Sequence, residues 1–217
     1  MKKLTSIFLA CIFLILSCSK EDTNSSSTST NTNPTGCNYF PYVAGSKYIF
    51  KKTKGTTITY DTLIAIKDTT IDGTKFLKCT EAGQPTFLAC NYKGYMTQIS
   101  DFSFLTMSCT LIGKNIKIGG SKGDMWIDSS SAPAGVSLSV ARDMEIKELN
   151  ISTTANGVSY NDVIKVEAQT YTYLGGFINS VVIANYYYSK NSGLIKVERY
   201  DGGSTTLSQL REFEKKI

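Results

Sequence analysis

The chain has 217 residues, of which 41% are hydrophobic and 19% are charged, and it contains no histidine. That length suits one domain, or two at most. The absence of histidine excludes Ser-His and Cys-His nucleophile pairs and every metal site that needs an imidazole ligand. The formal net charge of +5 is not gathered into a basic stripe, because no run of Lys and Arg exceeds two residues, so nucleic-acid binding is not expected.

The N-terminus has the pattern of a bacterial secretory leader. Residues 1–3 are MKK, residues 7–16 form an uncharged apolar run, and a serine and a cysteine follow. The run is about half of the roughly 20 residues that a spanning helix needs, so residues 1–17 are expected to be a cleaved signal peptide. Residues 15–18, ILSC, resemble the bacterial lipobox. This resemblance implies that Cys18 becomes the first residue and carries a diacylglycerol anchor and a palmitate chain.

Residues 19–22, SKED, place a lysine and two acids directly after that cysteine. They resemble the export signal of Bacteroidota-type surface lipoproteins. The resemblance implies lipid anchoring in the outer membrane with exposure at the cell surface, and the periplasmic face of the outer membrane is the alternative. Residues 23–36 are rich in Ser, Thr and Asn, with no apolar side chain to seed a core, so 18–36 is expected to be a lipidated, flexible tether.

Residues 37–217 are expected to form a single β-rich domain. Its four cysteines, in an exported chain, indicate two disulfides, and their spacing matches no zinc pattern. They are Cys37, Cys79, Cys90 and Cys109. A loop is expected at residues 81–85, with the turn centred between residues 84 and 85. The second and third cysteines then face each other across the hairpin, which favours Cys79–Cys90 with Cys37–Cys109 among the three pairings.

Apolar residues alternate with other residues along most of the domain, which is the period of a half-buried strand. The first such series is Ile58, Tyr60, Thr62, Ile64 and Ile66, and the longest is Val136, Leu138, Val140, Met144 and Ile146. A third lies within residues 164–169. Residues 181–188 are apolar on both faces, which predicts a central strand. Residues 207–217 are predicted to form a final strand rather than a short helix.

Short turns rich in Gly, Asn and Asp separate these runs, which predicts an all-β antiparallel meander. Because long sheets twist and curl, we expect a curved half-barrel or open barrel, with a two-layer β-sandwich as the alternative. Patches such as 39–41 (YFP), 71–73 (IDG) and 187–196 (YYSKNSGLIK) are similar to those of small β-rich envelope lipoproteins. By analogy of fold, LolA-like carriers hold acyl chains in a concave half-barrel.

Arg142 falls on the apolar face between Val140 and Met144. An inward arginine is costly unless it is paired. It therefore predicts contact with a carboxylate or phosphate of a ligand in a concave pocket, or else a buried acid partner or a bulge that turns it to solvent. The chain has 13 tyrosines, whose apolar ring and polar tip suit ligand contact. Tyr186 and Tyr188 share a strand face and join Arg142 as candidate binding residues.

No catalytic residue is predicted. The carboxylate pairs Asp124 with Asp128 and Asp143 with Glu145 each share one strand face, where a solvated role is the simplest interpretation. We therefore expect a non-enzymatic lipoprotein, held to the membrane by N-terminal acyl chains and without cofactor or metal, whose β-domain binds a glycan, lipid or peptide. A structural or interaction subunit of a cell-envelope complex is the alternative.

Overall fold

The computed structural model describes residues 35–104, 107–131 and 138–214. A short 3-10 helix, η1 (Thr35–Tyr39), precedes the strands. The strands are β1 (Lys47–Lys54), β2 (Thr57–Ile71), β3 (Thr74–Glu81), β4 (Gln84–Tyr92), β5 (Tyr95–Phe104), β6 (Met107–Lys117), β7 (Met125–Ser131), β8 (Leu138–Ala155), β9 (Val158–Leu174), β10 (Phe177–Ser189), β11 (Gly193–Asp201) and β12 (Ser204–Glu214). Within these ranges no helix is long and apolar enough to cross a membrane.

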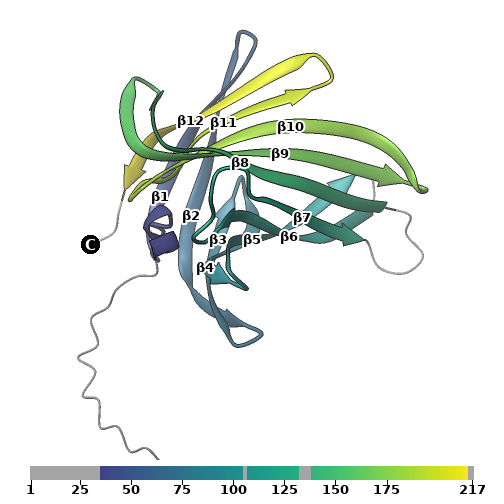
Figure 1. Ribbon diagram of the computed structural model, residues 1–217, viewed down its shortest axis with the longest axis horizontal. Helices are drawn as coiled ribbons and strands as arrows, with labels where there is room; N and C mark the ends of the chain where they lie inside the picture. Colours follow the sequence, from purple (N-terminus) through teal and green to yellow (C-terminus); the bar gives the residue numbers. More distant parts are fainter. Residues whose placement is uncertain (1–34, 105–106, 132–137, 215–217) are drawn as a thin grey trace, which may run out of the picture. The chain divides into compact units, whose positions relative to one another are not determined.

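The twelve strands form one antiparallel sheet in the order β6-β5-β4-β3-β2-β1-β12-β11-β10-β9-β8-β7. Strands that follow each other in the chain are paired, and the first strand also pairs with the last. The sheet curls until its two edge strands, β6 and β7, lie beside each other along one unsealed seam (Figure 1). The predicted curved antiparallel meander is therefore confirmed in its open-barrel form, and the two-layer sandwich does not form.

Strand β8 shows how side-chain alternation builds the interior. Leu138, Val140, Met144 and Ile146 are each 1% exposed, while the residues between them face outward and are half-buried, except for Arg142. The predicted inward face is therefore confirmed from Leu138 onward, and Val136 lies outside the described residues. Since one face of each strand is buried and the other meets solvent, this sheet follows the common antiparallel pattern.

In β2 the apolar series that we expected to face the core faces outward. Its exposed members, at 44–52% exposure, are Ile58, Tyr60, Ile64 and Ile66. The opposite face provides the core instead, with Leu63 paired with Tyr48 of β1 and Ala65 paired with Cys79 of β3. Both faces of this strand carry apolar residues, so alternation alone did not say which face is inside.

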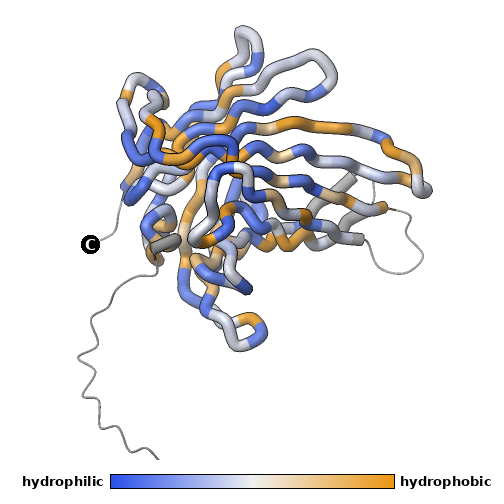
Figure 2. Tube along the Cα trace, viewed as in Figure 1, coloured by the Kyte–Doolittle hydropathy of each residue, from blue (hydrophilic) through white to orange (hydrophobic). Residues whose placement is uncertain are grey.

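The prediction for residues 181–188 is half correct. Strand β10 is central, between β9 and β11, but Val181 and Ile183 are each 39% exposed on its outer face. Figure 2 shows the resulting hydrophobic stretch along β10. The predicted final strand is confirmed as β12 up to Glu214, because its pairing with β1 and β11 holds the backbone extended, and residues 215–217 lie outside the described part.

The hairpin of β3 and β4 turns at Ala82 and Gly83, not through a loop over residues 81–85. Both residues have positive φ angles, 47° and 83°, as a type I′ turn requires. The turn therefore lies two residues earlier than expected, which moves every cross-strand partner by four positions. Cys79 lies opposite Thr86 rather than opposite Cys90.

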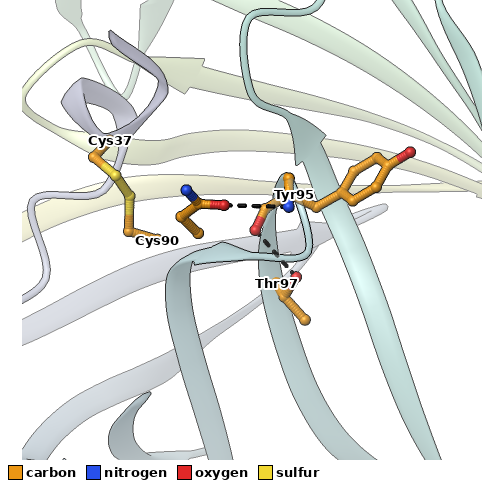
Figure 3. The surroundings of a disulfide bond; sticks show 6 residues. Cys37, Cys90, Tyr95 and Thr97 are labelled. Carbon is orange, nitrogen blue, oxygen red and sulfur yellow. Dashed lines mark hydrogen bonds between the residues drawn. A yellow bond between two sulfur atoms is a disulfide. The ribbon is translucent and has the colours of Figure 1, made fainter. Parts of the chain in front are cut away.

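The predicted pairing of Cys79 with Cys90 and of Cys37 with Cys109 is consequently wrong. Cys90 bonds to Cys37 of η1, with the two Cα atoms 5.4 Å apart (Figure 3). Cys79 is fully buried in the core and forms no disulfide with a described residue. Cys109 lies on β6, and its side chain is outside the part that the structure describes.

Two clusters of buried side chains fill the interior. One gathers around Tyr48, Leu63 and Leu77 near the β1–β4 wall. The other gathers around Trp126 and Met144 on β7 and β8. The space between these clusters is not completely filled, and it forms the cavity described next.

Candidate ligand-binding cavity

A cavity of about 270 Å³ lies inside the curled sheet and is bordered by members of both core clusters. Its apolar wall includes Phe40, Tyr42, Phe50, Leu63, Leu88 and Leu194. Its polar wall includes Glu81, Thr97, Gln98, Ser100, Asn115 and Arg142. A mostly apolar hollow with a few converging polar groups is the usual form of a small-molecule site.

Strand alternation explains why polar side chains reach this interior. Glu81 follows the buried Leu77 and Cys79 at two-residue spacing along β3, so its side chain lies on the same inward face. Asn115 lies in the same way two residues after Gly113 on β6, and both line the cavity. These polar positions interrupt inward faces that are otherwise apolar.

The N-terminal segment, residues 37–42, supplies two aromatic side chains to the cavity, Phe40 and Tyr42. It is fixed to the wall at separate points. The disulfide of Cys37 joins it to β4, and the backbone N–H of Leu194 on β11 donates to the Tyr42 hydroxyl at 3.1 Å. The cavity therefore depends on a segment that precedes the first strand.

Arg142 points inward from β8 and is paired with a buried acid. Its Nη2 donates to Oδ2 of Asp128 on β7 at 2.7 Å, and the two side chains are 11% and 0% exposed. The register is regular at this point, with Arg142 opposite Asp128, so no bulge turns it to solvent. The alternative of a buried acid partner is the one that the structure bears out, and the positive charge of Arg142 is neutralised within the protein.

A chain of hydrogen bonds runs from this pair along the polar wall. Arg142 Nη2 also donates to Asn115 Oδ1 at 3.5 Å, and Asn115 Nδ2 donates to Gln98 Oε1 at 3.5 Å. Gln98 Nε2 then donates to Glu81 Oε2 at 2.9 Å. Every donor points toward Glu81, so the bond dipoles are aligned from the cationic to the anionic end.

Glu81 ends that chain, and it is the acidic group of the cavity wall. Its residue is exposed at the end of β3, yet surrounding protein partly desolvates the carboxylate and raises its pKa above the usual glutamate value. The hydrogen bond from Gln98 opposes that rise, and Asp61 and Lys52 act in opposite directions. Among the described residues Glu81 forms no ion pair, so its charge is not neutralised as that of Arg142 is.

The two predicted tyrosines lie side by side on β10 and both line the cavity. The ring centroids of Tyr186 and Tyr188 are 6.4 Å apart and their planes differ by 17°. Tyr188 is 3% exposed, and its burial raises the pKa of the phenol well above its ordinary value. At neutral pH this phenol is therefore a neutral group.

The seam beside the cavity is bridged by side chains. Trp126 Nε1 on β7 donates to the Lys114 carbonyl of β6 at 2.6 Å, and the Lys114 N–H donates to Asp128 Oδ2 at 2.8 Å. The Ser130 hydroxyl donates to the Thr110 carbonyl. These bonds satisfy backbone groups of an edge strand that a neighbouring strand would otherwise pair.

The structure thus brings Arg142, Tyr186 and Tyr188 to one cavity, as separate sequence arguments predicted, and adds Glu81 and Gln98, which we missed. The signal for Glu81 was its two-residue spacing from Leu77 and Cys79, and the mistaken loop at 81–85 obscured it. Cys18 and its lipidation lie outside the described residues. In the described part, no group of three or more Cys, Asp or Glu side chains could hold a metal ion.

No known family model matches the chain, and no curated protein matches its sequence. One similar solved structure is described as a lipoprotein from Parabacteroides distasonis, with a TM-score of 0.49 and 13% identity, covering 81% of this chain and 98% of that one. Another is described as an exported protein with a YmcC-like fold from Bacteroides fragilis, with a TM-score of 0.44 and 10% identity over the same shares. Similarities with sequence identities and TM-scores this low do not assign the chain to a family.

Proposed function

We propose that this protein is a lipid-anchored envelope lipoprotein whose β-domain holds a small amphiphilic ligand without catalysis. The observation that carries the proposal is the interior cavity, with an aromatic and aliphatic wall facing a short row of polar groups. The apolar wall provides affinity through burial of the ligand, and the polar row orients it.

The size of the cavity narrows the three ligand classes considered from the sequence. Its volume of about 270 Å³ is slightly below the roughly 300–1,000 Å³ of typical small-molecule pockets. An oligosaccharide or a peptide of several residues exceeds that volume. A short aliphatic chain or a single ring with one polar group fits it, which favours the lipid-like class.

The envelope location in this proposal rests on the leader, the lipobox-like residues 15–18 and the tether. A Cys18→Ser variant tests the anchor, since it should lose labelling by radioactive palmitate and leave the membrane fraction. Unchanged membrane partitioning of the variant contradicts the anchor. Protease treatment of intact cells then distinguishes the cell surface from the periplasmic face.

Native mass spectrometry tests ligand binding directly. The chain from residue 18 onward, carrying Cys18→Ser, is exported and purified without detergent. We expect an added mass that disappears on denaturation, or a fluorescent apolar probe that the cavity takes up and a ligand displaces. Ser100→Phe, which fills the cavity wall, should abolish uptake, whereas Thr59→Phe at an exposed strand position should not. If the native protein shows no added mass and takes up no probe, the proposal is contradicted.

A second candidate function, an interaction subunit, is favoured by the outer face of β2. Ile64 and Ile66 are 44% and 46% exposed there, beside Ile58 and Tyr60. Exposed apolar side chains gathered on one strand are typical of contact surfaces. Blue native electrophoresis of membranes tests this candidate: a large complex that is lost in an Ile64→Lys, Ile66→Lys variant supports it, and migration as a monomer contradicts it.

A further inference from the structure

Two ionisable side chains of opposite charge line the cavity, Glu81 and Arg142, and they differ in whether they form an ion pair within the protein. The guanidinium of Arg142 lies 2.7 Å from the fully buried carboxylate of Asp128. Lys114 Nζ approaches the other oxygen of that carboxylate, at 3.6 Å, from outside the cavity wall. Arg142 is therefore already paired within the protein, so it attracts an anion less strongly than an unpaired guanidinium would.

Glu81 has no such partner among the described residues. One of its carboxylate oxygens accepts a neutral hydrogen bond from Gln98. The charged groups that act on it from neighbouring strands are Lys52 and Asp61, and these pair with each other at 3.3 Å. The cavity wall therefore carries one carboxylate whose charge is not offset.

Aromatic rings surround the same space. Phe40, Tyr42, Phe50, Tyr186 and Tyr188 all line the cavity. The faces of aromatic rings attract cations, and this attraction is strongest where water is excluded. A carboxylate and several rings around a small, partly open space form a combination that recognises organic ammonium groups.

We infer that the ligand is a small organic cation, an amine or quaternary ammonium with a short apolar body, whose positive charge pairs with Glu81. This inference rests on the proposed ligand-binding function and specifies its ligand class. The apolar body lies among the aromatic and aliphatic side chains, and the hydrogen-bond chain from Arg142 through Asn115 and Gln98 holds the carboxylate in place. Binding requires Glu81 to be ionised.

Isothermal titration calorimetry with hexylamine, hexyltrimethylammonium, 1-hexanol and hexanoate tests the inference, because the four probes share a body and differ in charge. The protein is the chain from residue 18 onward with Cys18→Ser. We expect both cations to bind roughly tenfold more tightly than the alcohol, the size of one charge-assisted contact. Glu81→Gln should reduce cation affinity to that of the alcohol, whereas Glu212→Gln, on the exposed face of β12, should change nothing.

The other outcomes separate the two proposals. Equal binding of all four probes overturns the cation inference and leaves the ligand-binding function in place. Tightest binding of hexanoate overturns it in favour of an anion at Arg142. If none of the four probes binds, the proposed function and the inference are both overturned. If Glu81→Gln fails to fold, the pH profile of the native protein decides: the preference of cation over alcohol must fall as Glu81 is protonated, and a constant preference contradicts the inference.

Discussion

Arg142 Nη2 and Asp128 Oδ2 meet at 2.7 Å inside the protein and join β8 to β7, with the acid fully buried. The same Asp128 oxygen accepts the backbone N–H of Lys114 on β6. One carboxylate therefore neutralises the cation of the cavity wall and also bridges the seam. The buried Asp128 side chain of β7 therefore connects β7 to both of its neighbours, β6 and β8.

Breaking this pair from one side should be expensive. Arg142→Met leaves the buried Asp128 carboxylate with Lys114 Nζ, at 3.6 Å, as its remaining cationic partner among the described residues. Because Lys114 offsets part of the lost pairing, the cost should reach at most about 3–5 kcal/mol of unfolding free energy. The double variant Arg142→Met, Asp128→Asn removes both charges and keeps an acceptor for the Lys114 N–H, so it should recover much of the loss. Urea unfolding of the two single variants and the double variant measures the coupling. Strict additivity of the two single effects contradicts the pairing.

The Cys37–Cys90 bridge closes a 53-residue separation and should stabilise the fold by about 4 kcal/mol on the chain-entropy scale. Cys90→Ala should lose that amount of unfolding free energy in urea unfolding.

Cys79 is expected to be a buried free thiol in the native protein, because burial raises the pKa of its thiol to about 12. Iodoacetamide should therefore leave Cys79 unmodified in the native protein and alkylate it after unfolding, without added reductant. A Cys79–Cys90 peptide in a non-reducing digest contradicts the assignment.

Trp126→Phe tests the side-chain bridge across the seam. The substitution keeps an aromatic ring in the core and removes the N–H that donates to the Lys114 carbonyl. Leaving that carbonyl unpaired should cost about 1–2 kcal/mol, measured by far-ultraviolet circular dichroism during urea unfolding. Hydrogen exchange should also quicken along β6 and not along β1, which is paired on both sides. Uniform acceleration across the sheet contradicts a local bridge.

Gly193→Ala tests the attachment of the N-terminal segment. Gly193 has a φ of 73°, and a Cβ there lies 2.9 Å from both Pro41 Cδ and Tyr42 Oη. Gly202→Ala is the matched control, because it adopts a φ of 54° and meets open space. Both variants pay about 1 kcal/mol of backbone strain, and only Gly193→Ala should also release residues 37–46 to limited proteolysis. Equal cleavage in the two variants contradicts the contact.

Glu81→Gln should make the fold more stable at neutral pH. The folded-state pKa of Glu81 is raised above its unfolded value, so ionisation costs stability above the raised pKa. As pH falls through that pKa the carboxyl gains its proton and the cost disappears. The stability difference between the variant and the native protein should therefore be present at pH 7 and vanish below the ordinary glutamate pKa. Thermal unfolding at a series of pH values measures it, and a difference independent of pH contradicts the raised pKa.

Local pattern predicted most of the fold because strand alternation and turn residues act over a few positions. The inward face of β8 and the position of Arg142 on it followed from two-residue spacing. The same reasoning chose the wrong face of β2, since the core side of that strand carries only two apolar residues, Leu63 and Ala65, and the face richer in apolar residues is exposed. It also shifted the β3–β4 turn by two residues, which produced the wrong disulfide and removed Glu81 from the inward face.

The sequence by itself determined an all-β antiparallel meander, the place of Arg142 on the apolar face of its strand and the shared face of Tyr186 and Tyr188, because each depends on neighbours along the chain. Only the tertiary structure decided which residues meet across the interior. The pairing of Arg142 with Asp128, the Cys37–Cys90 bond and the uncompensated Glu81 depend on how far the sheet curls and where it stops. Curling sums the twist of twelve strands, so contacts between distant strands follow from the closure of the whole sheet rather than from any one segment.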